Sequence, residues 1–196
     1  MSIKVAINGF GRIGRCTLRA IYEQGLQNEF DVVAINAAGD LATNAHLLKY
    51  DPTHGRFRTS VETEGENCII IDGKKVAFYS TKNPLDINWA SHGVDIVLEC
   101  TGAYTTKAKA QTLLDQGAKR VLISAPGGDD VDTTIVMGVN EGALKAGMTV
   151  VSNASCTTNC LAPVAKILSD AIGIKQGLMT TIHAYTNDQH VLDQAH

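Results

Sequence analysis

The chain has 196 residues, of which 44% are apolar and 19% are charged, proportions typical of a globular protein with a hydrophobic core. Its 17 basic and 20 acidic residues give a formal net charge of −3, and the basic residues are scattered, which disfavours nucleic acid as a partner. No apolar run approaches the roughly 18 residues of a membrane span. A strand pattern begins at Val5-Ala6-Ile7, so we expect no signal peptide before it. We therefore expect a cytoplasmic protein with no membrane partner.

Strand and helix patterns alternate along the first part of the chain. We expect, in order, a strand at 4–8, a helix at 13–24, a strand at 30–36, a helix at 43–49 and alternating strands within 57–79. A strand–helix–strand unit of about thirty residues is the minimum for two parallel strands with a crossover. Asp72-Gly73 lies between two apolar runs, which predicts an antiparallel hairpin.

The same alternation resumes after this insertion. We expect strands at 94–99, 120–124, 134–137 and 149–152, and helices at 106–116 and 141–145. Apolar strands that alternate with helices predict an α/β fold, a doubly wound and mostly parallel sheet covered on both faces.

A polar cluster after residue 152 marks a change of domain. We expect a helix at 160–171 and a strand at 178–183, while residues 187–196 close no recognisable element. The predicted domains are 1–153 and 154–196, the latter being the start of a truncated α+β domain.

A glycine-rich turn follows the first strand. Gly9-Phe10-Gly11-Arg12-Ile13-Gly14 fits the pattern G-x-G-x-x-G and lies directly between a strand and a helix. In this context the first glycine makes a tight turn, the second admits a pyrophosphate and the third lets the helix pack on the strand. The turn predicts dinucleotide binding, with Arg12 and Ile13 touching the phosphates. The alternative is a structural glycine turn in an unrelated sheet.

The end of the second strand bears on the choice between NAD and NADP. An NAD site usually has an acidic residue there, which binds the ribose hydroxyls and repels a 2′-phosphate. Here the strand ends Ile35-Asn36-Ala37-Ala38-Gly39-Asp40, with no acid at its tip. NADP acceptance is one hypothesis, and the other is that Asn36 or Asp40 holds the ribose.

Cys156 lies in a polar, hydroxyl-rich segment between a strand and a helix. A helix N-terminus stabilises the thiolate, which favours a nucleophilic cysteine. His183 is 27 residues further on, at the end of the next predicted strand, where it can approach Cys156 and exchange a proton. Each residue alone is more often a structural one. Cys160, one turn later, is expected to be buried and inert.

A zinc site at Cys156, Cys160 and His183 is a weaker hypothesis, because no close CxxC and no second histidine stand at ligand spacing. We therefore expect no metal. An odd number of widely spaced cysteines also argues against a disulfide framework, and Cys16, Cys68 and Cys100 are interpreted as packing residues.

A thiolate beside a nicotinamide suggests aldehyde oxidation through a thioester. The Cys156 N–H and the His183 ring are candidate donors to the oxyanion. The hydroxyls of Ser155, Thr157 and Thr158 suit an anionic nucleophile or a substrate phosphate, and otherwise cap the helix.

Three segments resemble the phosphorylating glyceraldehyde-3-phosphate dehydrogenases. They are Asn8 to Arg15, Ser152 to Pro163 and Thr181 to Thr186, and the likeness covers all 196 residues. The resemblance implies a Rossmann-type domain and oxidation of glyceraldehyde 3-phosphate with inorganic phosphate to 1,3-bisphosphoglycerate, in a glycolytic or gluconeogenic homotetramer.

The same resemblance assigns roles by position. Cys156 is the nucleophile and His183 its base, Ser155 and Thr157 contact the attacking phosphate, and Thr186 contacts the substrate phosphate. The implied cofactor residues are Asn8, Gly9, Phe10, Gly11, Arg12, Ile13, Asn36, Lys82, Thr101, Gly102 and Ser124.

The chain departs from the family at two points. Ala37 stands where NAD-dependent members have aspartate, which resembles the NADP-preferring gluconeogenic branch. The chain is also shorter than the members of the family, so we expect little turnover from it alone. An erythrose-4-phosphate dehydrogenase and a non-enzymatic dinucleotide-binding fragment are the alternative functions.

Overall fold

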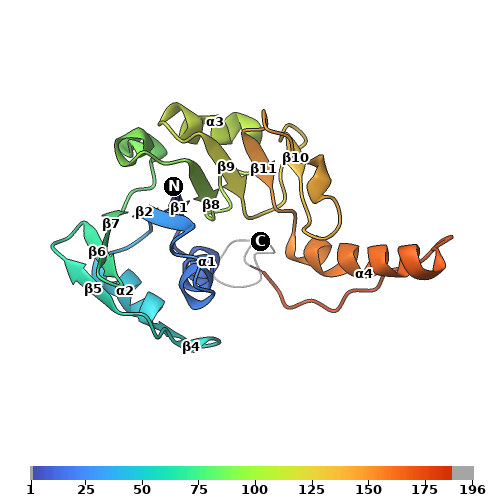
Figure 1. The fold of residues 1–196 in the computed structure, drawn as a ribbon, viewed down its shortest axis with the longest axis horizontal. Coiled ribbons are helices and arrows are strands. Elements are labelled where there is room, and N and C mark those ends of the chain that lie inside the picture. Colours follow the sequence, from blue (N-terminus) through green and yellow to red (C-terminus); the bar gives the residue numbers. More distant parts are fainter. Residues whose placement is uncertain (1, 187–196) are drawn as a thin grey trace. The chain divides into compact units, whose positions relative to one another are not determined.

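The computed structural model describes residues 2–186 (Figure 1). The chain forms two compact units, Met1–Pro163 and Val164–His196. The prediction for 187–196 lies outside the described residues.

The described part of the first unit contains a nine-stranded sheet. In spatial order its strands are β10 (Thr133–Thr134), β11 (Val150–Ser152), β9 (Arg120–Ile123), β8 (Ile96–Glu99), β1 (Ile3–Asn8), β2 (Phe30–Asn36), β7 (Lys74–Tyr79), β6 (Cys68–Ile71) and β5 (Val61–Glu64).

The pairing from β10 to β7 is parallel, while β7, β6 and β5 pair antiparallel. The predicted hairpin turn joins β6 to β7, and both Asp72 (φ 53°) and Gly73 (φ 74°) adopt the left-handed conformation that a tight hairpin needs. The doubly wound, mostly parallel sheet with an antiparallel insertion is therefore confirmed.

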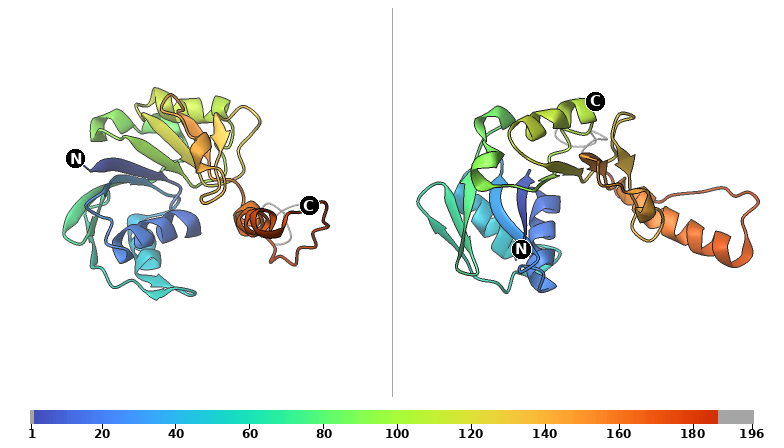
Figure 2. Two further views of the ribbon diagram at one scale, coloured as in Figure 1. Left: turned by 45° about the vertical axis from the view of Figure 1, so that its right-hand side comes forward. Right: turned by 45° about the horizontal axis from the view of Figure 1, so that its top comes forward.

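Helices cover both faces of this sheet. On one face α1 (Arg12–Glu23) and α2 (Leu41–Lys49) pack against the strands, and on the other lie α3 (Lys107–Asp115) and the 3₁₀ helix η2 (Trp89–His92) (Figures 1 and 2). Side chains alternate along β1, so Ile7 joins the core with Leu18 of α1, while Ala6 joins the core with Leu113 of α3. Two hydrophobic cores thus flank one sheet.

Shorter elements complete the described chain: β3 (Tyr50–Asp51), β4 (Gly55–Arg56), and the 3₁₀ helices η1 (Pro84–Asp86) and η3 (Glu141–Ala143). The strand expected at 134–137 ends at Thr134, because the Asn140 side chain accepts a hydrogen bond from Val136 N (2.8 Å) and donates to Thr134 O (2.9 Å). The side chain thus replaces a strand partner with a turn.

The helix α4 (Cys156–Ile172) begins four residues before its expected start. Ser155 Oγ accepts a hydrogen bond from Thr158 N (3.0 Å), so the serine caps the helix and the polar segment forms its first turn. None of the described side chains of α4 is buried, and Cys160, expected to be buried, is exposed.

The strand expected at 178–183 is wrong. These residues form neither helix nor strand, and both Leu178 and Ile182 are fully exposed. A strand needs a neighbour that takes up its backbone N–H and C=O groups, and no described segment pairs with this one. In the same described part of the chain, no helix is both long and apolar enough to cross a membrane.

Gly14 lets α1 approach β1 closely. A Cβ placed there would lie 2.2 Å from Gly9 O and 3.0 Å from Ile7 Cγ2. Atoms at such distances overlap, so only glycine fits where the helix crosses the strand end.

We expect Gly14→Ala to lower the free energy of unfolding by about 3 kcal/mol, because the backbone must shift to admit the methyl group. Urea unfolding followed by circular dichroism measures the loss. Gly11→Ala is the matched control, since no atom lies within 4 Å of a Cβ there, and it should change stability by less than about 0.5 kcal/mol. Equal stability of the two variants would contradict the close packing.

Candidate dinucleotide site and nucleophile

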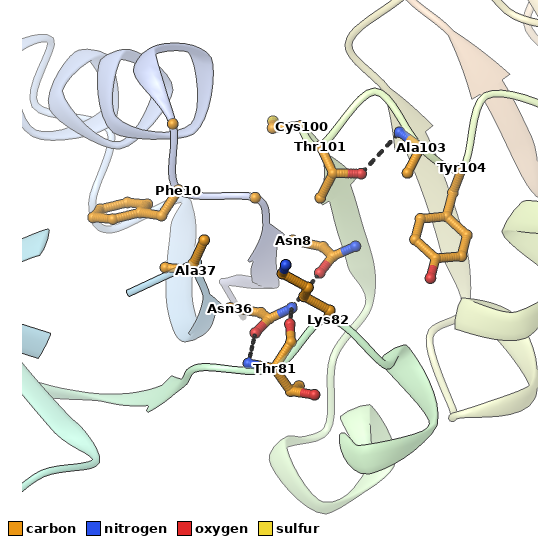
Figure 3. Close-up of a pocket in the computed structure, with 13 residues that line it drawn as sticks. Asn8, Phe10, Asn36, Ala37, Thr81, Lys82, Cys100, Thr101, Ala103 and Tyr104 are labelled. Atoms are coloured by element: carbon orange, nitrogen blue, oxygen red, sulfur yellow. Dashed lines mark hydrogen bonds between the residues drawn. The ribbon is translucent and has the colours of Figure 1, made fainter. Parts of the chain in front are cut away.

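A cavity of about 490 Å³ opens at the carboxyl ends of β1, β2 and β8 (Figure 3). In parallel sheets this edge is the usual place of a ligand, because the glycine turn and the crossover loops meet there. The cavity is lined by Asn8, Gly9, Phe10, Gly11, Asn36, Ala37, Ala38, Thr81, Lys82, Cys100, Thr101, Ala103 and Tyr104.

Seven of the predicted cofactor residues line this cavity: Asn8, Gly9, Phe10, Gly11, Asn36, Lys82 and Thr101. Four others, Arg12, Ile13, Gly102 and Ser124, are not among the lining residues. Gly102 directly follows the lining residue Thr101. Ser124 N donates to Glu99 O (3.0 Å), which places Ser124 at the end of β9, beside the cavity wall. Arg12 and Ile13 lie in the exposed first turn of α1.

Gly9, Phe10 and Gly11 line the cavity, and we call this turn the glycine cradle. A side chain at Gly9 would collide with the segment that follows β8. Gly9 has φ +98°, and a Cβ there would lie 2.6 Å from Thr101 N. Gly11 is the N-cap of α1, and having no side chain it leaves the first N–H groups of the helix to bind an anion. The residues present therefore fit the pyrophosphate of a dinucleotide.

Arg12 is held beside this turn by an ion pair. Its guanidinium lies 3.3 Å from Asp51 Oδ2 and 3.4 Å from Asp51 Oδ1. Asp51 also accepts hydrogen bonds of 2.8 Å from the N–H groups of Thr53 and His54. The bond from His54 N–H is the largest of the influences that lower the pKa of Asp51 to about 2.

The groups around Ala37 determine what can bind a ribose. Asn36 Nδ2 donates to Asn8 Oδ1 (2.8 Å) and Thr81 O (3.1 Å). Asp40 caps α2 by accepting from Thr43 N (2.7 Å), and that bond lowers the pKa of its carboxyl. Among the described residues that line the cavity, Lys82 carries the one charged side chain.

The sequence analysis missed four residues of the cavity wall: Thr81, Cys100, Ala103 and Tyr104. Burial raises the pKa of the Cys100 thiol to about 11, so it is a neutral wall residue. A usable signal existed, since Thr81 precedes Lys82, Cys100 precedes Thr101-Gly102, and Ala103 and Tyr104 follow it.

Cys156 is exposed at the first residue of α4. The turn before it is held by the Asn159 side chain, which donates to Asn153 O (2.7 Å) and Ser155 O (3.0 Å), and Ala154 adopts φ +58°. Ser155 Oγ and Thr158 Oγ1 lie 2.7 Å apart, and Thr157 follows Cys156 in the same turn. The thiol therefore stands at a helix N-terminus among hydroxyl groups.

His183 and Thr186 lie in the second unit, in its exposed segment after α4. His183 Nδ1 lies 2.5 Å from Ala184 O. The approach of His183 to Cys156 remains a prediction. Within residues 2–186, no cluster of three His, Cys, Asp or Glu side chains has the geometry to hold a metal.

The low pKa of Asp51 predicts a pH-dependent stability. A carboxyl whose pKa is near 3.9 in the unfolded chain and about 2 in the folded one stabilises the fold above pH 4 and loses this effect as the pH falls through 2. Asp51→Asn should thus be less stable than the parent at pH 7, and the gap should close between about pH 4 and pH 2. Urea unfolding across this range measures it, and a constant gap would contradict the assignment.

Comparison with known proteins agrees with this geometry. The family model "Glyceraldehyde 3-phosphate dehydrogenase, NAD binding domain" matches residues 3–107, and the model of the C-terminal domain matches residues 155–196. Over the whole chain, the plasmid glyceraldehyde-3-phosphate dehydrogenase of Cupriavidus necator is 55% identical, that of Cereibacter sphaeroides 57% and that of Pseudomonas aeruginosa 55%. The chain spans 58%, 57% and 58% of these relatives, respectively. The sequence patterns, the sheet with its glycine cradle and both family models agree that the chain belongs to the glyceraldehyde 3-phosphate dehydrogenase family.

Proposed function

We propose that the chain carries the dinucleotide site and the nucleophile of a phosphorylating glyceraldehyde-3-phosphate dehydrogenase. The exposed Cys156 thiol at the start of α4 carries this proposal, because it stands in the same chain as a glycine cradle for a dinucleotide. A binding module has no use for such a thiol. The names of the relatives suggest glyceraldehyde 3-phosphate as the substrate. Inorganic phosphate is proposed as the second substrate, because the hydroxyl groups beside Cys156 suit an anionic nucleophile.

The proposed chemistry starts at the Cys156 sulfur. The thiolate adds to the aldehyde carbon, and the resulting alkoxide is stabilised by hydrogen-bond donors at the helix N-terminus. A nicotinamide cofactor bound in the cavity would supply the acceptor for the hydride from this carbon, and loss of the hydride would leave a thioester on Cys156. An oxygen of inorganic phosphate then attacks the thioester carbon, the C–S bond breaks, and the acyl phosphate leaves with the thiolate restored.

Other residues are assigned supporting roles in this proposal. His183 exchanges the proton with the thiol and the substrate, Ser155 and Thr157 bind the attacking phosphate, and Thr186 binds the substrate phosphate. The hydroxyls of Ser155 and Thr157 flank the sulfur in sequence, which supports their assignment. We also propose a homotetramer, and a cytoplasmic location, where a reducing milieu keeps the thiol reduced.

The cofactor assignment extends to NADP. Ala37 leaves space at the end of β2, Asn36 is engaged by Asn8 and Thr81, and Asp40 is engaged as the cap of α2. Lys82, at the same cavity, offers a positive charge to a 2′-phosphate. These contacts support acceptance of both NAD and NADP, and with it a gluconeogenic as well as a glycolytic direction.

Cys156→Ser should lower kcat at least about 1,000-fold, because a hydroxyl does not replace the thiolate as nucleophile. The rate is followed at the nicotinamide absorbance with glyceraldehyde 3-phosphate and phosphate, on the protein at its natural length. Cys160→Ser is the matched control, one turn along the same helix and also exposed, and it should keep the parental rate. An active Cys156→Ser variant, or a parent active on erythrose 4-phosphate alone, would contradict the proposal.

Ala37→Asp should shift the cofactor preference towards NAD. The new carboxylate would bond the ribose hydroxyls and repel a 2′-phosphate, so kcat/KM for NADP should fall at least about tenfold while that for NAD holds or rises. The ratio of the two kcat/KM values measures the shift. An unchanged ratio would show that this position does not face the 2′ group.

A further inference from the structure

Three polar side chains lie side by side in neighbouring strands at the dinucleotide cavity, two of them in its lining and the third behind it. The register pairs Asn8 of β1 with Asn36 of β2 on one side and with Glu99 of β8 on the other. All three are buried, with 1%, 6% and 1% of their surface exposed, respectively. Asn36 Nδ2 donates to Asn8 Oδ1 (2.8 Å), and Asn8 Nδ2 donates to Glu99 Oε2 (2.5 Å). We call Asn36, Asn8 and Glu99 the polar row.

The direction of these hydrogen bonds is set at one end by backbone groups. Thr81 N donates to Asn36 Oδ1 (3.2 Å), and Thr81 O accepts from Asn36 Nδ2 (3.1 Å) (Figure 3). Since a backbone N–H can only donate and a carbonyl can only accept, the Asn36 amide has one possible orientation. Its Nδ2 therefore donates to Asn8, and Asn8 must in turn donate to Glu99.

At the other end of the row, both carboxylate oxygens of Glu99 must act as hydrogen-bond acceptors. Thr101 N donates to Glu99 Oε1 (2.7 Å), and the Thr101 hydroxyl donates to the same oxygen. Ala103 N donates to Thr101 Oγ1 (3.0 Å; Figure 3), which leaves the hydroxyl hydrogen for Glu99. An ionised carboxylate accepts all three of the bonds to Glu99, whereas a carboxamide of the same shape does not.

From these contacts we propose that Glu99 is a positioning residue of the dinucleotide site. Its carboxylate orients Asn8 and, through it, Asn36, and so holds the glycine turn after β1, the Thr101 segment after β8 and the Thr81-Lys82 segment in one arrangement. Asn8, Asn36, Thr81, Lys82 and Thr101 all line the cavity, while Glu99 is not among the lining residues and acts through them. The inference rests on the proposed dinucleotide function.

The protonation of Glu99 depends on its burial and on its hydrogen-bond donors. Burial raises the pKa of the Glu99 carboxyl above its usual value, and the hydrogen bonds from Thr101 and Asn8 oppose that rise. The hydrogen bonds from Thr101 and Asn8 thus favour the ionised form of Glu99, and Glu99 in turn orients these two residues. A buried charge is expensive unless it is well bonded, which is a reason to expect that changes at Glu99 propagate along the row.

The first test is Glu99→Gln, measured on the protein at its natural length by calorimetric titration with NAD. The new amide would face Asn8 Nδ2 with a second donor, so either the contact is lost or Asn8 turns and disrupts Asn36. We expect the Kd for NAD to rise at least about tenfold. Because the variant also loses stability, the titration is made well below its melting temperature.

Asp132→Asn is the matched control for stability. Asp132 also accepts backbone hydrogen bonds, from Thr149 N (2.8 Å) and Val150 N (2.9 Å), and pairs with Lys107, but it does not line the cavity. Its replacement should lower the melting temperature and leave the Kd for NAD within about twofold of the parent. A loss of stability alone would therefore not reproduce the effect of Glu99→Gln.

The second test exchanges the amide of Asn8 and the carboxylate of Glu99. In Asn8→Asp/Glu99→Gln, the glutamine amide donates to the aspartate, and the other aspartate oxygen accepts from Asn36, so both contacts along the row again join a donor to an acceptor. Asn8→Asp alone places two carboxylates in contact and should lower the melting temperature. The double variant should recover about half or more of the loss seen in Glu99→Gln, a coupling that a double-mutant cycle measures.

The outcomes separate the two proposals. Parental affinity for NAD in Glu99→Gln, or strictly additive melting temperatures in the exchange, would overturn the positioning role. A parent protein that binds neither NAD nor NADP would overturn the proposed function. The melting temperatures of the exchange variants do not depend on a cofactor, so they would still test the direction of the hydrogen bonds from Asn36 through Asn8 to Glu99.

Discussion

The parallel register of β2, β1 and β8 is the constraint on which the dinucleotide cavity depends. It places Asn36, Asn8 and Glu99 in one row at the carboxyl ends of the strands. Each strand then continues into a segment that lines the cavity, so the hydrogen bonds of the polar row connect backbone segments that are far apart in the sequence. The strand ends and the ligand site are parts of the same arrangement.

The contact between α1 and β1 supplies the other half of the site. Gly14 packs on the Gly9 carbonyl, and this closeness aims the start of α1 at the cavity edge. Cores on both faces of the sheet keep the helices in place, with Leu18 on one side and Leu113 on the other. The site is therefore built on rigid elements, which favours pre-organised binding.

The segment that carries Cys156, the proposed nucleophile, is held by contacts between residues that are close in sequence. Ser155 caps α4 and Asn159 ties the turn before it, so the position of Cys156 at the helix start needs only neighbours in sequence. The position expected for His183 depends on distant residues instead, because a strand at 178–183 would need partner strands to bond its backbone N–H and C=O groups. No described segment pairs with residues 178–183. The chain spans about 58% of the length of the relative from Cupriavidus necator.

The sequence by itself determined the alternating strands and helices of the nine-stranded sheet, the hairpin at Asp72-Gly73, the glycine turn and the helix that follows the cysteine segment, because each depends on short-range preferences of glycine, apolar runs and helix caps. It wrongly predicted a strand at 178–183. It did not predict the wall residues Cys100 and Tyr104, the ion pair of Arg12 with Asp51, or Glu99 as the acceptor beneath the cavity. These contacts join residues from different strands and turns, and only the tertiary structure decided them, since sheet register and burial bring distant side chains to within hydrogen-bond distance.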